Sequence, residues 1–289
     1  MTGSSIVPPA GAAPDPGGPP SDELRDLAIA AALAVGPDLR AAFGRTHQVA
    51  SKANFHDLVT ESDAAAEATI RRHLLSGTPD AAIVGEEGGL IGDGLVRWYV
   101  DPIDGTNNFA SGIPFFCVSI GATVADRLVA GVVYDPIRDE LFAASGGIAT
   151  CNGEPLLSRG APSDAEATLI TGFPSYEPWP QAPSGPGDLE RLGEMIRSFR
   201  TLRRLGSAAL GLAYVAAGRA DVAFGISSSP WDVAAGAILV EAAGGTYRAV
   251  PRSASSDRTP WLSPGYLAHV ADFDPARSCL ADIASLDER

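Results

Sequence analysis

Two short apolar runs in the first half of the chain each end at acidic residues, and this pattern constrains the fold more than any other feature. Residues 81–84 lead into Gly85-Glu86-Glu87-Gly88, and residues 98–100 lead into Asp101-Pro102-Ile103-Asp104-Gly105-Thr106. Apolar runs of this length, bounded by turn residues, predict buried strands. Carboxylates are therefore expected to gather at the tips of strands.

Further helices and strands are predicted around these two runs. The expected elements are helices over residues 21–43 and 61–75 and strands over residues 115–124, 128–134 and 140–144. Asp22 and Glu23 complement the dipole at the start of the first helix. Ala125-Asp126-Arg127 is typical of a hairpin turn between the first two of these strands. The first half is therefore predicted to consist of helices packed on an antiparallel sheet.

The pattern changes after Ser158, where strand and helix segments alternate and favour a smaller α/β layer. The expected elements are strands over 169–173 and 221–226, helices over 208–217 and 231–243, and a Pro-rich loop over 174–187. Residues 1–20 are rich in Pro, Gly, Ala and Ser and cannot bury enough apolar area to fold, so they are predicted to be a disordered tail. The remaining chain divides into an N-terminal α+β part over 21–158 and a C-terminal α/β part over 159–289.

The composition excludes several classes of protein. Hydrophobic residues make up 45% of the 289 residues, which is enough for a sizeable core. There is no apolar run of about 18 residues and no basic-then-apolar secretory layout at the N-terminus. A formal net charge of −14 argues against a nucleic-acid surface, which needs clustered Lys and Arg. We therefore expect a cytoplasmic protein without nucleic-acid or membrane partners.

Cysteine and histidine are poor candidates for the chemistry. The cysteines are odd in number and widely spaced, which favours buried free thiols over disulfides or a thiolate metal site: Cys117, Cys151 and Cys279. The histidines show no close pairing: His47, His56, His73 and His269. Because neither a Cys-x5-Arg nor a Ser-His-Asp arrangement occurs, no covalent enzyme intermediate is expected.

Each acidic motif also has a purely structural interpretation. Asp104-Gly105 is a common turn dipeptide. Asp232 falls in the first turn of a helix with Ser229 as its N-cap, where the helix dipole alone would explain it. Thr60 and Asp63 fit a variant of the capping box. Together, however, carboxylates without basic partners repel one another, and a hard cation such as magnesium, manganese or calcium would neutralise them.

The motifs, taken together and in this order, resemble those of the inositol monophosphatase family of magnesium-dependent, lithium-sensitive phosphatases. The stretches that carry the resemblance are Asp57-Leu58-Val59-Thr60-x-x-Asp63, Gly85-Glu86-Glu87, Trp98-Tyr99-Val100-Asp101-Pro102-Ile103-Asp104-Gly105-Thr106-Asn107-Asn108-Phe109 and Trp231-Asp232-Val233-Ala234-Ala235-Gly236. The resemblance extends over roughly residues 21–270. It implies an α/β sugar-phosphatase fold, in which layers of helices and sheets alternate, and a homodimer.

The same resemblance implies two or three Mg²⁺ ions per subunit. Glu86, Asp101 and the Ile103 carbonyl would hold one ion. Asp101, Asp104 and Asp232 would hold a second, so that Asp101 bridges the two. Glu86 would also approach a third, weaker ion. Lithium is expected to inhibit by replacing magnesium at the second position.

Catalytic and substrate-binding residues are implied in the same way. The Thr106 hydroxyl, linked to Asp63, would orient the attacking water and help to deprotonate it together with Glu86. The amides of Gly105 and Thr106 would cradle phosphate oxygens at a helix start. The implied substrate-binding residues are Gly105, Thr106, Asp104, Ala208, Asp232 and Lys52. Lys52 resembles a lysine on the family's mobile loop, and taken alone it would be a solvated surface cation.

The substrate stays open, because the superfamily acts on inositol phosphates, sugar bisphosphates such as fructose 1,6-bisphosphate, histidinol phosphate and phosphoadenosine phosphate. Gly206-Ser207-Ala208-Ala209 resembles a loop that contacts the inositol ring, which favours inositol 1-phosphate or a related polyol or sugar phosphate. Gly225 stands where such enzymes present a glutamate, so the pocket for the alcohol part is predicted to be larger and less selective. A catalytically inactive relative that serves as a regulatory binding protein is the alternative from another class.

Overall fold

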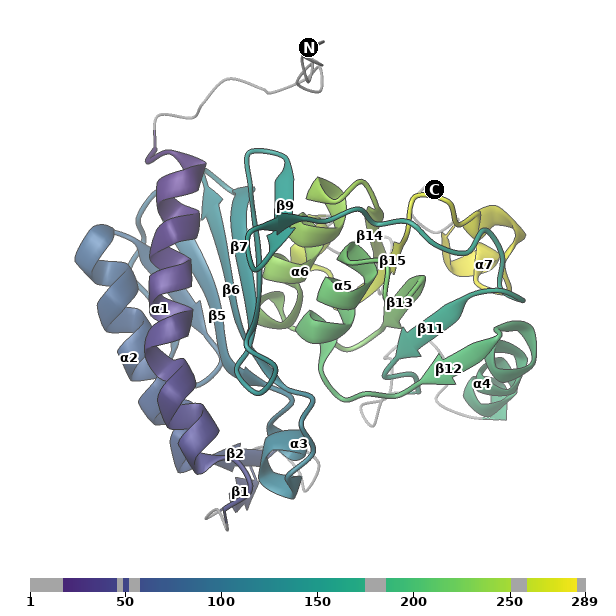
Figure 1. The fold of residues 1–289 in the computed structure, drawn as a ribbon, viewed down its shortest axis with the longest axis horizontal. Coiled ribbons are helices and arrows are strands. Elements are labelled where there is room, and N and C mark those ends of the chain that lie inside the picture. The colour runs from purple at the N-terminus through teal and green to yellow at the C-terminus, as the bar shows by residue number, and fades with distance from the viewer. Residues whose placement is uncertain (1–17, 46–48, 52–57, 175–185, 251–258, 285–289) are drawn as a thin grey trace.

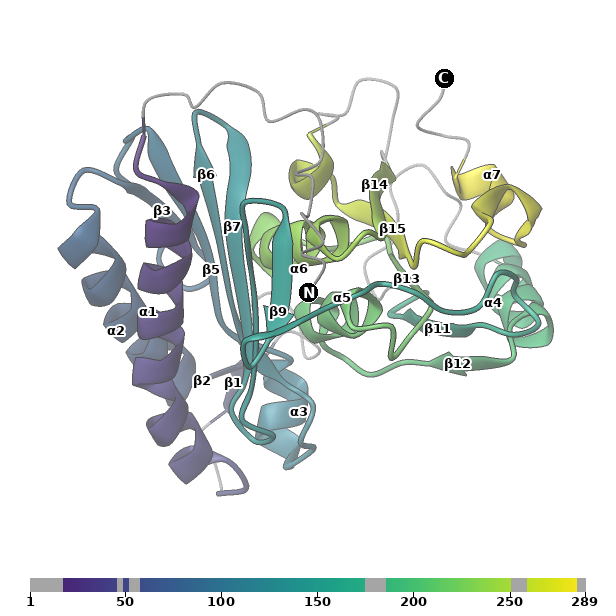
Figure 2. The ribbon, with the colours of Figure 1, turned by 45° about the horizontal axis from the view of Figure 1, so that its top comes forward.

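The computed structural model of the chain describes residues 18–45, 49–51, 58–174, 186–250 and 259–284. Its helices and sheets form alternating layers (Figures 1 and 2). Across the molecule these are α1 (Ser21–Ala42) with α2 (Glu61–Gly77), an eight-stranded sheet, α5 (Ala208–Ala216) with α6 (Pro230–Ala242), a five-stranded sheet, and α4 (Pro186–Ser198) with α7 (Ala281–Ala284). This arrangement confirms the layered α/β fold expected from the sequence.

The eight-stranded sheet is antiparallel except for one pair. In spatial order its strands are β10 (Glu154–Pro155), β9 (Ile148–Cys151), β8 (Glu140–Ser145), β7 (Arg127–Asp135), β6 (Cys117–Val124), β5 (Val96–Asp104), β3 (Ala82–Gly85) and β4 (Gly89–Ile91). Only β3 and β5 run parallel. The predicted hairpin joins β6 to β7 through Ala125 and Asp126, whose φ values are 47° and 57°. A two-residue turn with positive φ at both positions matches the right-handed twist of the strands that it joins.

Helices cover both faces of this sheet, which explains why residues on both faces of its central strands are buried. Every residue of β6 is buried, because α1 packs on one face and α6 on the other. Trp98 is fully buried on β5, and its indole nitrogen donates a hydrogen bond to Thr78 Oγ1 at 3.0 Å. The apolar burial stabilises the sheet, and no polar atom of Trp98 is left unpaired.

The five-stranded sheet is mixed. In spatial order its strands are β12 (Thr201–Arg203), β11 (Thr168–Thr171), β13 (Val222–Gly225), β15 (Gly265–His269) and β14 (Thr246–Val250). β11 is parallel to both of its neighbours, and β15 is antiparallel to both of its own. Helices α5 and α6 are almost wholly apolar because they are buried between the two sheets. Both begin and end within a residue of their predicted bounds.

Three further short elements are β1 (Val49–Ser51), β2 (Leu58–Thr60) and α3 (Thr106–Ser111).

Some predictions about the organisation of the chain are not tested by the structure. Residues 1–17 of the predicted tail lie outside the described residues, and the division at residue 158 stays a prediction. The strands of the larger sheet end at Pro155, and the first of the smaller sheet begins at Thr168. Within the described part of the chain, no helix is long and apolar enough to cross a membrane.

The three cysteines are free, as predicted, but only one of them is buried. All three thiols are free, and Cys117 on β6 is fully buried. Cys151 and Cys279 are half-buried, which corrects the expectation that all three lie in the core. The physical reason is their position: β9, which carries Cys151, is paired only with two short neighbours near the edge of the sheet, where side chains reach solvent.

Candidate active site

An irregularity in β5 turns two aspartates toward the same side of the sheet. Asp101 pairs with Ser119, and Asp104 pairs with Cys117, so β5 has one more residue than β6 over this step. Such a bulge reverses the alternation of side chains, and a proline such as Pro102 is tolerated where a ladder hydrogen bond is already lost. Asp101 and Asp104 are consequently both buried, with 3% and 7% of their surfaces exposed.

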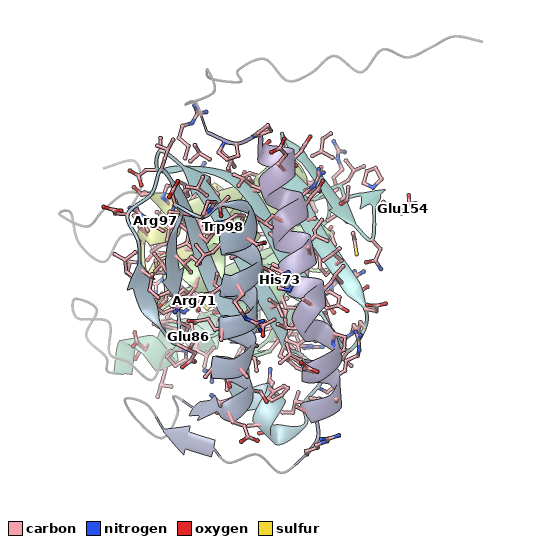
Figure 3. The ribbon with its side chains drawn as sticks, turned by 90° about the vertical axis from the view of Figure 1, so that its left-hand side faces the viewer. Arg71, His73, Glu86, Arg97, Trp98 and Glu154 are labelled. Carbon is pink, nitrogen blue, oxygen red and sulfur yellow. The ribbon has the colours of Figure 1, made fainter. Side chains whose placement is uncertain are left out.

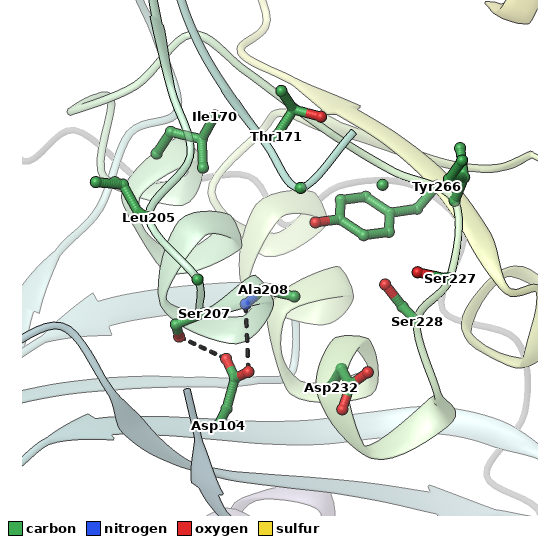
Figure 4. A pocket seen from close by; sticks show the side chains of 14 residues that line it. Asp104, Ile170, Thr171, Leu205, Ser207, Ala208, Ser227, Ser228, Asp232 and Tyr266 are labelled. Atoms are coloured by element: carbon green, nitrogen blue, oxygen red, sulfur yellow. Dashed lines mark hydrogen bonds between the residues drawn. The ribbon is translucent and has the colours of Figure 1, made fainter. Parts of the chain in front are cut away.

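Asp104 joins the larger sheet to the second half of the molecule. Its carboxylate accepts hydrogen bonds from Ser207 Oγ at 2.5 Å and from the Ala208 amide at 3.3 Å (Figure 4). It also accepts one from the Ala209 amide at 2.7 Å. These amides open α5, where the helix dipole favours a negative charge. Burial is the main reason that the pKa of Asp104 is raised to about 6, and the three donors partly offset it.

Asp101 lies in a field of negative charge. Its Oδ1 accepts a hydrogen bond from the Ile103 amide at 2.9 Å. Its pKa is raised well above the usual range, first by burial and then by the charges of Glu86, Asp104 and Asp232, with a further contribution from a hydrogen bond with Glu86. Glu86 directly follows β3, and its amide donates to the Val100 carbonyl at 3.1 Å. The predicted acidic residues therefore do act on one another.

The turn that presents Glu86 is held by Glu67, which the motif analysis missed. Glu67 on α2 is 3% exposed and accepts hydrogen bonds from the amides of Glu87 and Gly88 at 2.7 and 2.9 Å. Arg71, which is labelled in Figure 3, pairs with the same carboxylate at 2.9 Å. A signal was present in the sequence, since Glu67 lies four residues after Asp63 and so shares its helical face.

Thr106 and Asp63 meet as predicted. Thr106 Oγ1 lies 3.2 Å from Asp63 Oδ1 and 3.1 Å from the Ile103 carbonyl oxygen, and Asp63 is fully buried. The chain reaches α3 through Gly105, whose φ of 100° is strained for any other residue. The Thr60 side chain is outside the description, so the predicted Thr60–Asp63 capping box stays a prediction.

Asp232 has the structural role predicted for it and also borders a cavity. Its Oδ2 accepts a hydrogen bond from the Ser229 amide at 2.7 Å, as expected of a residue in the first turn of α6. It also lines a cavity of about 230 Å³ together with Asp104 and Ala208 (Figure 4). The other walls of this cavity are Ile170, Thr171, Gly172, Leu205, Gly206, Ser207, Gly225, Ile226, Ser227, Ser228 and Tyr266.

The candidate ligands are of the type that binds a hard cation, although they do not surround a single point in this structure. Among the described residues, no three acidic, cysteine or histidine side chains are arranged as a metal cluster. Instead, Asp101, Asp104 and Asp232 are each held by neighbouring amide or hydroxyl donors. The charges that raise the pKa of Asp101 are all acidic, and every candidate ligand is an oxygen. This chemistry suits Mg²⁺ better than a soft metal.

Lys52 is the one predicted site residue whose position is not described, and the histidines were not expected to take part in the chemistry. Lys52, His47 and His56 lie outside the described residues. His73 is exposed on α2 (Figure 3). His269 is buried on β15 with Nδ1 2.9 Å from the Val270 carbonyl oxygen. Neither of the described histidines lines the cavity.

Comparison with known proteins places the chain in a family. Residues 21–272 match the inositol monophosphatase family. "Nus factor SuhB" of Pseudomonas aeruginosa is 45% identical over 201 residues, which cover 65% of this chain and 71% of that protein. "Inositol-1-monophosphatase" of Synechocystis is 38% identical over 223 residues, 76% of each chain. The crystal structure of the extragenic suppressor protein suhB from Bartonella henselae superimposes with a TM-score of 0.78 at 31% identity, over 92% of this chain and 97% of that one. The chain therefore belongs to the inositol monophosphatase family, in which magnesium dependence is general, and this membership supports phosphatase activity.

Proposed function

We propose that this protein hydrolyses a small phosphate monoester, inositol 1-phosphate or a related polyol or sugar phosphate, by attack of a water molecule in the presence of Mg²⁺. The observation that carries the proposal is the mutual repulsion of Glu86, Asp101, Asp104 and Asp232 beside a cavity that two of them line. Such a cluster costs stability unless a cation neutralises it, and a cavity beside it gives a phosphate access to that cation.

The carboxylates are assigned to metal binding. Ions held by Glu86, Asp101 and the Ile103 carbonyl, and by Asp101, Asp104 and Asp232, would neutralise phosphate charge and lower the pKa of water. The pKa values of Asp101 and Asp104 are raised, so these carboxyls hold their protons to a higher pH than usual. Each must lose its proton before it can act as a metal ligand. Metal affinity should therefore increase with pH across the range in which these two groups titrate.

Thr106 and Asp63 are assigned to the attacking water. A hydroxyl has one proton to donate, and Thr106 has two acceptors within reach, Asp63 Oδ1 and the Ile103 carbonyl. If the Ile103 oxygen is a metal ligand, Asp63 is the acceptor that remains. The Thr106 oxygen can then accept a hydrogen bond from water and orient it, with Glu86 as the general base.

The substrate is assigned to the space between the two halves. The amides of Gly105 and Thr106 would receive phosphate oxygens at the start of α3. The alcohol part would enter the cavity, where Ala208 forms a wall and Asp104 and Asp232 border the phosphate. Lys52 remains a proposed substrate-binding residue, expected on a loop near the third ion. A homodimer and a cytoplasmic location are proposed on the family resemblance alone.

The direct test is release of inorganic phosphate from purified protein with and without Mg²⁺. We expect turnover of inositol 1-phosphate, and weaker turnover of fructose 1,6-bisphosphate, histidinol phosphate and phosphoadenosine phosphate. Lithium should inhibit at limiting magnesium. Preference for one of the other three substrates would change the assigned substrate, and no magnesium-dependent release from any of them would contradict the proposed function.

A second candidate function is binding of a regulatory partner, favoured by the name "Nus factor SuhB" that the relative from Pseudomonas aeruginosa carries. The two functions separate in the variant Asp101→Asn. Loss of a cellular phenotype in parallel with phosphate release would support catalysis as the function, whereas a phenotype that persists without hydrolysis would favour the binding role.

A further inference from the structure

The position where the family resemblance led us to expect a glutamate is covered by a tyrosine. Gly225 on β13 and Tyr266 on β15 are direct cross-strand partners. Directly opposite residues of an antiparallel pair project to the same face, and Gly225 has no side chain, so the ring of Tyr266 occupies the space above it. A Cβ on Gly225 would lie 2.5 Å from Cε1 and 3.0 Å from Cζ of that ring.

This geometry shows what occupies the side of Gly225 from which a side chain would project. The phenol ring of Tyr266 fills that side, although Gly225 itself borders the cavity, and the expectation of a larger pocket stays a prediction. The backbone does not require the glycine, because the φ of Gly225 is not in the left-handed region. Gly225 is instead required by the close approach of the ring, so any side chain at this position must displace Tyr266.

The Tyr266 ring is held from its other side by Tyr247. The two rings are stacked, with centroids 5.8 Å apart and planes 12° from parallel. Both tyrosines are 5% exposed, but only Tyr266 lines the cavity, and its hydroxyl is directed into it (Figure 4). Contact on both faces leaves the ring few rotamers, so a substrate meets a hydroxyl whose position is already fixed.

Several other polar groups of the cavity already have protein partners. Thr171 Oγ1 donates to the Phe224 carbonyl at 2.7 Å. Asp104 and Asp232 accept hydrogen bonds from Ser207 and from the Ser229 amide, respectively. Within the described residues, the Tyr266 hydroxyl forms no hydrogen bond. Burial, with the nearby charges of Asp104 and Asp232, raises the pKa of this phenol, which therefore stays neutral.

We propose that Tyr266 is a specificity-determining residue, whose hydroxyl hydrogen-bonds an oxygen of the substrate's alcohol part while its ring forms the wall of that pocket. The proposal rests on the proposed phosphatase function. A carboxylate at this place could only accept hydrogen bonds, whereas the neutral phenol can also donate one. The substrates selected are phosphate monoesters whose alcohol part offers an oxygen acceptor, including acceptors that carry negative charge.

The test compares Tyr266→Phe with the wild type on two substrates. Inositol 1-phosphate has hydroxyls that can reach the pocket, whereas methyl phosphate has an alcohol part too small to reach it. Losing one neutral hydrogen bond should lower kcat/KM for inositol 1-phosphate by roughly three- to tenfold, mainly through KM, and should change kcat/KM for methyl phosphate less than about twofold. Tyr247→Phe is the matched control and should change neither, because its hydroxyl does not border the cavity.

A second variant tests the wall itself. Gly225→Ala introduces the Cβ that displaces the Tyr266 ring, so it should lower the ratio of the two kcat/KM values in the same direction as Tyr266→Phe. If Tyr266→Phe lowers kcat/KM equally for both substrates, the role of Tyr266 is structural and the proposal is wrong. The proposal is also wrong if the variant leaves kcat/KM for inositol 1-phosphate unchanged. If the wild type hydrolyses neither substrate, the assignment of Tyr266 as the residue that recognises inositol 1-phosphate is wrong. The phosphatase function itself is contradicted only if fructose 1,6-bisphosphate, histidinol phosphate and phosphoadenosine phosphate also release no phosphate.

Discussion

The two sheets contribute to the site in different ways. In the eight-stranded sheet, the acidic groups lie within two short stretches at the ends of β3 and β5, and a bulge in one strand brings Asp101 and Asp104 together. In the five-stranded sheet, the proposed pocket for the alcohol part depends on Gly225 and Tyr266, which are far apart in sequence and meet only through strand pairing. On the proposed function, the reaction would depend on local motifs, whereas selectivity would depend on a cross-strand contact.

A buried histidine of the five-stranded sheet responds to pH in the opposite direction from the two buried aspartates of the eight-stranded sheet. Burial raises the pKa values of Asp101 and Asp104, so without a cation they destabilise the folded protein as pH rises. Burial lowers the pKa of His269 in the smaller sheet, so it destabilises the folded protein as pH falls. The two halves therefore set opposite limits on the pH at which the metal-free protein is stable.

Metal removal should give the largest effect. Chelation should abolish phosphate release, and Asp101→Asn should lower kcat/KM about a hundredfold or more. The asparagine keeps an Oδ1 acceptor for the Ile103 amide and removes a carboxyl whose folded pKa is raised. Below its unfolded pKa that carboxyl contributes stability, which is lost as pH rises through the folded pKa. The metal-free variant should therefore have a Tm at pH 7.5 at least as high as that of the wild type.

Asp126→Asn is the control for this pair of measurements, because Asp126 is an exposed carboxylate in the turn between β6 and β7. It should change neither activity nor Tm appreciably. Full turnover in excess chelator would rule out the metal-dependent reaction. A lower Tm of metal-free Asp101→Asn would show that the acidic cluster does not destabilise the folded chain.

Removing the Thr106 hydroxyl should be the next largest effect. Thr106→Ala deletes the group that links Asp63 to the proposed water, and we expect kcat to fall roughly a hundredfold with little change in KM. Thr106→Ser retains the hydroxyl and should recover most of the activity. Steady-state kinetics on both variants is sufficient. Equal losses in the serine and alanine variants would show that packing of the methyl group, rather than the hydroxyl, is what matters.

A smaller effect is expected from Glu67, which positions the turn bearing Glu86. Glu67→Gln removes a buried charge that accepts from two amides and pairs with Arg71. The magnesium concentration for half-maximal activity should rise roughly tenfold, and the free energy of unfolding should fall by about 2–4 kcal/mol. Glu61→Gln changes an exposed residue of the same helix and is the control. An unchanged magnesium dependence would show that Glu67 does not influence metal binding.

The elements predicted correctly from the sequence are those with a local signal. Helices α5 and α6 end where Gly218 and Gly244 take positive φ, and Asp126 in the β6–β7 turn is a residue type that tolerates positive φ. β5 is longer than its apolar core of residues 98–100, because the bulge continues pairing through Asp104. This extension of the strand could not be predicted from the sequence, because it contains a proline and two acidic residues, which are unfavourable in a regular strand.

The parts of the site that sequence reasoning missed depend on contacts between distant residues. Nothing local to Gly225 indicates that Tyr266 covers it, and Glu67 belongs to no motif that was recognised. Ser207 and Ala209 were noted only as part of a loop, although they donate to Asp104 from the other half of the molecule. Which carboxylate binds which ion, and how Lys52 takes part, stay predictions.

The smallest expected effect tests the opposite pH response of the five-stranded sheet. His269 on β15 is 5% exposed, and its pKa is lowered mainly by burial and further by the charge of Arg248. Below a pH of about 6.5 the unfolded chain binds a proton that the folded chain does not, so folding stability is lost as pH falls from there toward the folded pKa. His269→Asn keeps a nitrogen near the Val270 carbonyl and removes the titration. Urea unfolding of metal-free protein at pH 7.5 and 5.5 should show the wild type losing up to about 1 kcal/mol more than the variant. If wild type and variant lose equal stability over this interval, His269 does not titrate differently in the folded and unfolded states, and the smaller sheet sets no lower pH limit through this residue.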